Sequence, residues 1–372
     1  MVSTWARLKP LIIFVLLAHT LIVFVTNNVL FPVSYLPDQE KYLTIASYIR
    51  GDPTVRSEFF SLPNYGITVR TAATIFAYFP VPFVGAVQAI GLVNVLLYFL
   101  GYLYLQRRGI HSRLARWFYL LYPSLALYSA LALRDTLILL FMIFSVDSFL
   151  RKKYLFSLLM TVPLFLLKFQ NALLLWVVYF AFLLLTERKF WMILLALIMS
   201  IGIFVAFRRY FSISLLETYR KAFYIENGGS ASSYVPIGGL GGWARVLITA
   251  IPNFLFAPMP WQARNGLQLI QGLENAVVLY LFVRLIYLKR RFHLKSHTFL
   301  FLLLFICISS VVYGIVILNF GTAARYRFPF VTIFLVYLSV YTVGRPSTAY
   351  PPTIIRERRK ERRRASHQVQ VD

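Results

Sequence analysis

The sequence predicts an all-α integral membrane protein, and three observations support that prediction. Of its 372 residues, 59% are hydrophobic and only 14% are charged, whereas a soluble domain has about 25% charged residues. The apolar residues form long runs, as in a chain that crosses a membrane several times. The basic residues gather in short segments between these runs. Together these features argue against a soluble enzyme.

A helix needs roughly 20 apolar residues to cross a bilayer. The runs predict about ten transmembrane helices, with two larger outer loops that carry short interfacial helices. The hairpins 115–150 and 154–187 consist of runs shorter than 20 residues, so an alternative is that their helices are shallow or tilted in the membrane. The ten predicted spans are 9–28, 83–105, 115–133, 135–150, 154–169, 171–187, 190–208, 266–288, 298–319 and 328–344.

The net charge is +25, and the positions of the basic residues predict how the spans are oriented in the membrane. With ten spans, the basic clusters all fall on one side of the membrane, the side that is cytoplasmic under the positive-inside rule. Both termini are then cytoplasmic, and loops 29–82 and 209–265 are outside. Residues 1–344 form one transmembrane domain. The tail 345–372 has eight basic and three acidic residues, and we expect it to be disordered and to attract anionic lipid headgroups. Since the charge follows the membrane boundaries, nucleic-acid binding is not expected.

Several ionisable residues lie at the predicted outer boundary, where a charge is a functional hypothesis by default. Cations come from separate turns, and acids and aromatic residues accompany them. Two shorter pieces, 67–79 and 243–256, are expected to lie in the interface. The candidate residues are Asp38, Glu40, Arg134, Asp135, Lys168, Gln170, Trp261, Gln262, Glu274, Arg325 and Arg327.

This pattern suits transfer of a sugar from a polyprenyl-phosphate donor. The lipid tail stays in the bilayer, so the phosphate lies at the interface, where Arg134, Lys168, Arg325 and Arg327 would neutralise it. Asp38 or Glu40 would accept the proton of an acceptor hydroxyl. The remaining candidates would contact the substrate, with a flat apolar ring for the sugar at one of them. These substrate-binding candidates are Asp135, Gln170, Trp261, Gln262 and Glu274.

Each candidate also has a structural interpretation. Arg134 and Asp135 can neutralise each other, Lys168 can extend to headgroups, and Arg325 with Arg327 can anchor a helix. The acids of loop 29–82 can be solvated, Trp261 can be an interfacial anchor, and Glu274 can pair with Arg284 or an outer arginine. We also expect His19 to form a hydrogen bond between helices and Asp147 to pair with Arg151 at i+4.

The sequence indicates no cofactor. Its single cysteine, Cys307, excludes a disulfide framework and a cysteine-based zinc site. The five histidines include no pair at metal-ligand spacing on the expected active side. Dependence on a divalent metal stays open.

Several motifs resemble those of GT-C glycosyltransferases. Pro37 to Tyr42, Ala46 and Arg50-Gly51-Asp52 resemble the first-loop acid, tyrosine and glycine run of the protein mannosyltransferase and of the bacterial lipid A and arabinose transferase types. Residues 325–329 resemble the RYR-x-P sequence before their last helix. Segments 122–135 and 256–261 resemble bacterial exopolysaccharide proteins, some of them oligosaccharide polymerases.

The resemblance implies a polytopic enzyme of the cell membrane with a lipid-linked donor, a glycan or lipid acceptor, and Asp38 or Glu40 as the loop-one acid. Two features depart from it, because no soluble domain follows the last span and two acids compete for one role. An alternative is a repeat-unit polymerase of O-antigen or exopolysaccharide with a polyprenyl-pyrophosphate donor, although its Arg-x10-Gly signature is missing from loop 209–265. A second alternative is a polytopic transporter or flippase.

Overall fold

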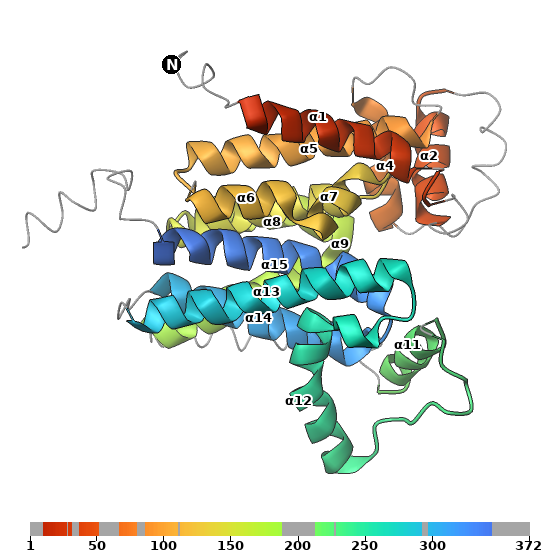
Figure 1. Cartoon of the computed structure of the whole chain (residues 1–372), viewed down its shortest axis with the longest axis vertical. Helices are drawn as coiled ribbons and strands as arrows, with labels where there is room; N and C mark the ends of the chain where they lie inside the picture. The colour runs from red at the N-terminus through yellow and green to blue at the C-terminus, as the bar shows by residue number, and fades with distance from the viewer. Residues whose placement is uncertain are drawn as a thin grey trace, which may run out of the picture.

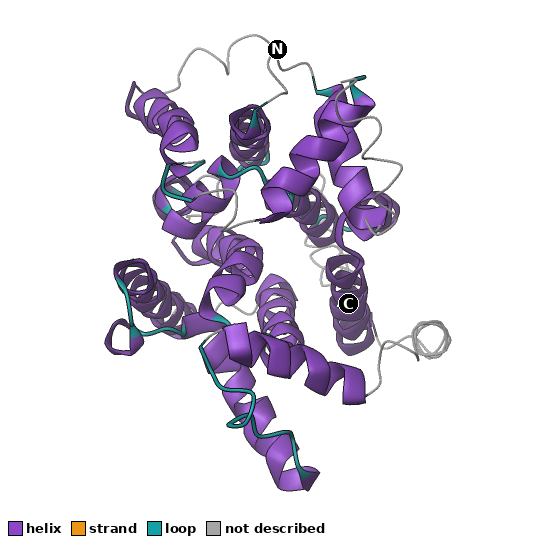
Figure 2. Cartoon of the chain, turned by 90° about the vertical axis from the view of Figure 1, so that its right-hand side faces the viewer, coloured by secondary structure: helices purple, strands orange, loops and turns teal. Residues whose placement is uncertain are grey.

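The computed structural model describes residues 10–27, 29–31, 37–51, 67–79, 86–110, 112–187, 213–226, 228–291 and 297–343. The named elements in these ranges are all helical (Figure 2). The predicted span 190–208 and the tail 345–372 lie outside the described residues. The elements are α1 Pro10–Thr26, α2 Pro37–Ile49, α4 Ile67–Tyr78, α5 Val87–Arg107, α6 Arg113–Leu121, α7 Pro123–Ala130, α8 Asp135–Leu150, α9 Tyr154–Glu187, α11 Ile213–Glu226, α12 Gly239–Phe256, η3 Pro260–Gln262, α13 Gly266–Arg291, α14 His297–Val316 and α15 Phe320–Val343.

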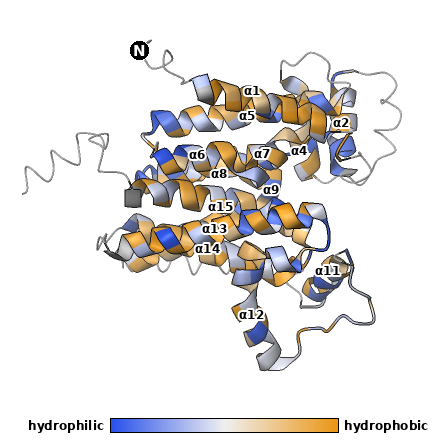
Figure 3. Cartoon of the chain, in the orientation of Figure 1, coloured by the Kyte–Doolittle hydropathy of each residue, from blue (hydrophilic) through white to orange (hydrophobic). Residues whose placement is uncertain are grey.

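Five helical segments within the described residues are long and apolar enough to cross a membrane. They support the prediction of an all-α membrane protein. Hydrophobic residues predominate along the bundle helices (Figure 3). The count of ten spans remains a prediction. The five segments are Val87–Arg107, Tyr154–Thr186, Gly266–Leu288, His297–Val316 and Phe320–Val340.

Helix α15 occupies the middle of the bundle, between α6 to α8 on one side and α13 with α14 on the other (Figure 1). Of the apolar stretch of α15, 83% is buried inside the protein. Phe328, Phe330 and Phe334 have no exposed surface. Large buried aromatic side chains make α15 the packing centre, so its polar residues have to be satisfied by other helices.

The segment Tyr154–Thr186, one of the five, belongs to α9, which is a hairpin of two shorter helices rather than one long helix. Its backbone leaves the helical region at Lys168, with φ −160° and ψ 88°. Trp176 Nε1 donates to Thr161 Oγ1 at 2.9 Å across this break. Ser157 and Tyr179, which lie equally far from Lys168 along the chain, both contact the Ser145 hydroxyl, at 3.2 and 2.7 Å. The two halves are therefore antiparallel, as the sequence predicts for 154–187.

The end of the bundle where α5 and α8 finish is fixed by one carboxylate. Asp147 is buried and forms ion pairs with Arg108 at 3.2 Å and Arg151 at 3.0 Å. The predicted i+4 pair is confirmed. The predicted interhelical hydrogen bond of His19 is also confirmed, since its Nε2 lies 2.8 Å from Ser129 Oγ in α7.

The start of α15 differs from the sequence-based prediction of residue 328. Asn319 Oδ1 accepts hydrogen bonds from the N–H groups of Gly321 at 2.8 Å and Thr322 at 3.2 Å, which begins the helix eight residues earlier. Pro329 lies inside this helix. Arg325 and Arg327 are thus helical residues two positions apart, and such residues point to different faces.

The two predicted outer loops contain helices of their own. Segment 29–82 holds α2 and α4, and α4 corresponds to the predicted short piece 67–79. Segment 209–265 holds α11, α12 and η3, and α12 includes the predicted piece 243–256. Figure 1 shows α2 and α4 at one end of the bundle and α12 running across the direction of the bundle helices. A Cβ atom on Gly314 would lie 2.3 Å from the Ala250 carbonyl oxygen, so glycine allows α12 to cross α14 closely.

Candidate functional site

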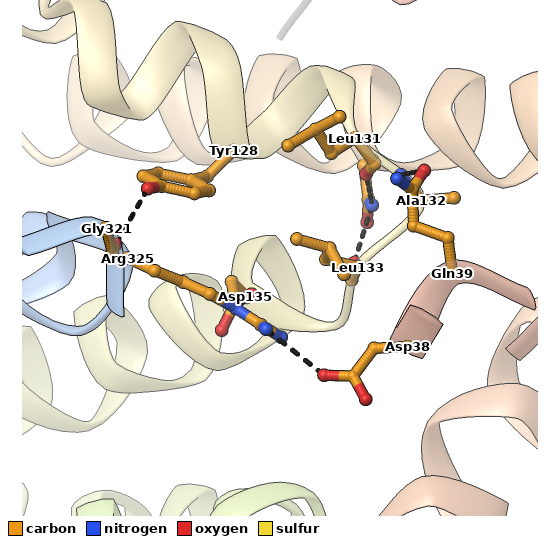
Figure 4. A network of polar contacts seen from close by, with 10 residues as sticks. Asp38, Gln39, Tyr128, Leu131, Ala132, Leu133, Asp135, Gly321 and Arg325 are labelled. Atoms are coloured by element: carbon orange, nitrogen blue, oxygen red, sulfur yellow. Dashed lines mark hydrogen bonds and ion pairs between the residues drawn. The ribbon is translucent and has the colours of Figure 1, made fainter. Parts of the chain in front are cut away.

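The non-helical turn between α7 and α8 is stabilised by amide side chains from α5, from α2 and from the residue that follows α1. Asn94 Nδ2 donates to the carbonyl oxygens of Leu131 at 2.7 Å and Leu133 at 2.6 Å. Gln39 Oε1 accepts from the Ala132 N–H at 3.4 Å (Figure 4), and Asn27 binds the Ala130 carbonyl oxygen at 2.8 Å. Unpaired backbone groups inside a membrane protein are costly. These amides therefore permit a non-helical turn that positions Arg134 and Asp135.

Arg325 joins this turn to α2. Its Nε donates to Asp135 Oδ2 at 2.6 Å, and its Nη1 donates to Asp38 Oδ2 at 3.1 Å (Figure 4). The Asp135 side chain is 5% exposed and the Asp38 side chain 39%. Arg325, which lies 190 positions after Asp135 and 287 positions after Asp38, thus binds both carboxylates with one guanidinium group.

Lys168 is the third cation at this place. It is buried, and its Nζ lies 3.2 Å from the ring centroid of Tyr326 and 5.3 Å from that of Tyr313. Asp135, Arg325 and Arg134 are the charges that act on it. No carboxylate oxygen of the described residues lies within ion-pair distance of Lys168 Nζ. Aromatic faces therefore hold a cation that has no direct counter-ion here.

Arg134 is half-buried at the start of α8. Its buried Nη1 has no hydrogen-bond partner among the described residues. Arg134, Arg325, Asp135 and Asp38 all act electrostatically on the hydroxyl of Tyr326, and the same four act on that of Tyr42 in α2. We call Asp38, Arg134, Asp135, Lys168 and Arg325 the charge cluster.

Two predicted members lie apart from the charge cluster. The Arg327 guanidinium is buried, and its Nη1 donates to the carbonyl oxygens of Phe254, Leu255 and Ala257 at 3.3, 3.3 and 2.7 Å. It therefore ties the end of α12 to α15. Arg325 and Arg327 are two positions apart in one helix, so their side chains point to different faces and do not meet at one site.

Glu274 accepts hydrogen bonds from the first turn of α7. Its carboxylate accepts from the Ser124 N–H at 2.9 Å and from the Ser124 hydroxyl at 2.5 Å. This is a favourable place for a negative charge, at the positive end of a helix. Arg327 acts electrostatically on Glu274, whereas Arg284 donates a hydrogen bond to the Tyr280 hydroxyl at 3.3 Å. Within the described residues Glu274 forms no ion pair with Arg284 or with an outer arginine, and its direct partner is Ser124.

The other predicted residues are exposed. Glu40 lies in the first turn of α2, and Gln170 follows the break in α9. Trp261 is 79% exposed in η3, and Gln262 Oε1 accepts from the Met259 N–H at 2.8 Å. No recorded contact joins these four side chains to the charge cluster within the described part of the chain.

Sequence reasoning placed Asn171 at the outer boundary beside Lys168, but it did not single out Tyr326 or Tyr313 as site residues. Tyr313 donates a hydrogen bond to Asn171 Oδ1, and its ring centroid lies 5.4 Å from that of Tyr326. The signal available for Tyr326 was its place between two arginines. Aromatic residues are so frequent in this chain that no pattern marked Tyr313.

The setting of Asp38 affects its use as a base. Burial alone would raise the pKa of the Asp38 carboxyl, but the charges of Arg325 and Lys41 outweigh it and hold this pKa below its ordinary value. The Lys41 ammonium lies 3.3 Å from Asp38 Oδ1. A carboxylate whose pKa is lowered accepts a proton less readily.

The charge cluster can bind an anion, because it has three cations, two carboxylates and one unpartnered guanidinium nitrogen. Within the described ranges, no group of three or more His, Cys, Asp or Glu residues is arranged to hold a metal ion. No family model, curated protein or solved structure matches this chain. Chemical arguments about function therefore start from the charge cluster.

Proposed function

We propose that this chain is a membrane glycosyltransferase that binds a polyprenyl-phosphate-linked sugar at the charge cluster and transfers the sugar to a cell-surface glycan or lipid. In this proposal Lys168, Arg325 and Arg134 hold the phosphate. Asp38 accepts the proton of the acceptor hydroxyl, with Glu40 as the other candidate base. The charge cluster faces the outside of the cell membrane, and both termini are cytoplasmic.

Lys168 is the observation that carries this proposal. A buried ammonium without a carboxylate within ion-pair distance is unfavourable, since desolvation is not offset by a counter-ion. A bound anion would supply the missing charge. An anionic group at a membrane boundary fits this need, and the lipid phosphate of a polyprenyl donor lies at that depth.

Binding of polyprenyl monophosphate to the purified chain in lipid nanodiscs tests the proposal, with uncharged polyprenol as the reference lipid. Lys168→Met keeps the length of the side chain and removes the charge. We expect it to weaken phosphate binding by about 1.5–3 kcal/mol, the value of a hydrogen bond to a charged group. That corresponds to roughly 10- to 150-fold in Kd.

The same variant should not destabilise the protein, because it removes an uncompensated buried charge. Lys221→Met is the matched control, since Lys221 is exposed in α11 and forms no hydrogen bond or ion pair with another described residue. A Lys168→Met protein that unfolds more easily but binds polyprenyl monophosphate normally would assign Lys168 a structural role and would remove the basis of the proposal.

A second function is favoured by the pairing of Asp38 with Arg325. A repeat-unit polymerase with a polyprenyl-pyrophosphate donor would rely on arginines rather than on a carboxylate base. Asp38→Asn distinguishes the two. A transferase that uses Asp38 as its base should lose about 10²-fold or more in rate, whereas the polymerase should retain activity and should bind polyprenyl pyrophosphate more tightly than the monophosphate.

The orientation has its own test. Reporter fusions at Gly51 and Gly228 should both report the outside, and a fusion at the C-terminus should report the cytoplasm. Both glycines lie in turns with φ +88°, at the ends of α2 and α11, so an inserted domain interrupts no helix. A cytoplasmic signal at Gly51 would put the charge cluster on the wrong side for a lipid-linked donor.

A further inference from the structure

Arg325 holds two carboxylates that differ in environment. The Asp135 side chain is 5% exposed and binds Nε at 2.6 Å. The Asp38 side chain is 39% exposed and binds Nη1 at 3.1 Å. Each carboxylate contacts a different nitrogen of the same guanidinium. One contact can therefore be exchanged while the other stays in place.

The Asp38 contact is the one that can open. A freed Asp38 would still be partly solvated and would keep Lys41 as a partner at 3.3 Å. Removing Arg325 from Asp135 would instead leave a buried carboxylate without its direct partner, which is strongly unfavourable. An incoming anion would therefore compete with Asp38 and leave Asp135 bound.

The surroundings favour such an anion. Lys168 lies within the electrostatic reach of Arg325 and Arg134, and one buried nitrogen of Arg134 lacks a partner. A phosphate group accepts several hydrogen bonds and brings at least one full negative charge, so it can engage more of these cations than the Asp38 carboxylate does.

We propose that binding of the donor phosphate displaces Asp38 from Arg325, so that the same event that seats the donor frees the carboxylate that takes the acceptor proton. This exchange rests on the proposed function. It explains how one aspartate can be ion-paired in the empty protein and basic in the donor complex.

The transfer step then balances as follows. The acceptor oxygen forms a bond to the anomeric carbon of the sugar, and its proton moves to Asp38 Oδ2. The bond between the anomeric carbon and the phosphate oxygen breaks, and its electron pair stays on the phosphate. Arg325 and Lys168 offset the added negative charge. Before the donor binds, Asp38 is a poor base, which limits transfer to an occupied site.

Affinity measurements in lipid nanodiscs test the exchange. Since Asp38 competes with the phosphate, Asp38→Asn should tighten binding of polyprenyl monophosphate by up to about fivefold, the effect of losing one exposed ion pair. Binding of polyprenol should not change. Glu226→Gln is the control for charge removal, because Glu226 is exposed in α11 and forms no hydrogen bond or ion pair within the described part of the chain.

Carbon-13 NMR of the aspartate carboxyls gives a second measurement on the unaltered protein. The chain has five aspartates, and Asp38→Glu identifies the signal of Asp38. Its pKa should rise when polyprenyl monophosphate is added and should not respond to polyprenol.

The outcomes separate the two proposals. If the wild-type chain binds the monophosphate no better than polyprenol, the proposed function and the exchange both fail. A second outcome is that the wild type prefers the monophosphate, while Asp38→Asn weakens this binding or leaves it unchanged and the pKa of Asp38 does not rise. In that case the exchange is wrong and the phosphate site stands. Tighter binding in Asp38→Asn with a rising Asp38 pKa supports the exchange.

Discussion

Replacing Asp135 by Asn should destabilise the fold far more than the same replacement at Asp38, although both carboxylates bind Arg325. The Asp135 side chain is 5% exposed and that of Asp38 is 39% exposed. Removing one partner of a buried ion pair costs about 3–5 kcal/mol, whereas an exposed pair contributes about 0.2–1 kcal/mol. The two variants should therefore differ by at least about 2 kcal/mol in free energy of unfolding.

The assay is reversible unfolding of the full chain in mixed micelles by titration with SDS, at neutral pH and one micelle composition. Asp135→Asn also leaves Lys168 and Arg134 beside Arg325 without their nearest negative charge. Arg325→Met should relieve this, so Asp135→Asn should cost less in that background, with a coupling energy of about 0.5–3 kcal/mol.

Two results would refute the reasoning. One is an equal loss of stability in Asp38→Asn and Asp135→Asn. The other is an unchanged cost of Asp135→Asn when Arg325 is replaced by Met, which would mean that Asp135 contributes to stability through contacts other than this ion pair.

Three further outcomes are expected. Tyr326→Leu should weaken polyprenyl monophosphate binding by about 0.5–2 kcal/mol, because Lys168 loses the ring that it contacts. Tyr326→Phe keeps the ring and should bind as tightly as the wild type. If Tyr326→Leu also bound as tightly as the wild type, the cation–π contact would not contribute to binding. Gly91→Ala should destabilise the fold by about 1–3 kcal/mol in the SDS titration, because its Cβ would lie 2.6 Å from the Ala130 carbonyl oxygen. The pKa of Asp38 is lowered in the fold, so its contribution to the free energy of unfolding should be complete above about pH 4 and should decrease as the pH falls further. Asp38→Asn should therefore lose less stability than the wild type when the pH is lowered below about 4.

Much of the bundle could be predicted from the sequence, because hydropathy and charge report depth in a membrane. The hairpin around Lys168 and the pair of Asp147 with Arg151 follow from run lengths and from i+4 spacing. The same reasoning brought Arg134, Lys168 and Arg325 to one end of the bundle. Their role as a phosphate site stays a prediction.

Direction around a helix axis could not be predicted in the same way. Pro329 and the two arginines made residues 321–329 resemble a turn, so Arg325 and Arg327 were expected to act together. The cap from Asn319 places both in α15, where their side chains separate by the helical rotation. Glu274 shows the same limit, because its partner Ser124 lies 150 positions away and no local pattern links them.

The buried charged groups that have no ion pair within the described residues differ in what they bind, and this difference bears on function. Glu274 binds the N–H and hydroxyl groups of Ser124, and Arg327 Nη1 binds three carbonyl oxygens at the end of α12, although the buried Nη2 of Arg327 has no partner among the described residues. Lys168 binds only ring faces among its recorded contacts, and a buried nitrogen of Arg134 is unpartnered. Proteins tolerate such incomplete satisfaction mainly at sites that act on something else. Arg134 and Arg325 act electrostatically on Lys168, and the second carboxylate that Arg325 binds is partly exposed. A buried lysine without a carboxylate within ion-pair distance and the most exchangeable contact of the charge cluster therefore occur together. That coincidence favours a ligand over an internal ion pair as the reason for the charge cluster.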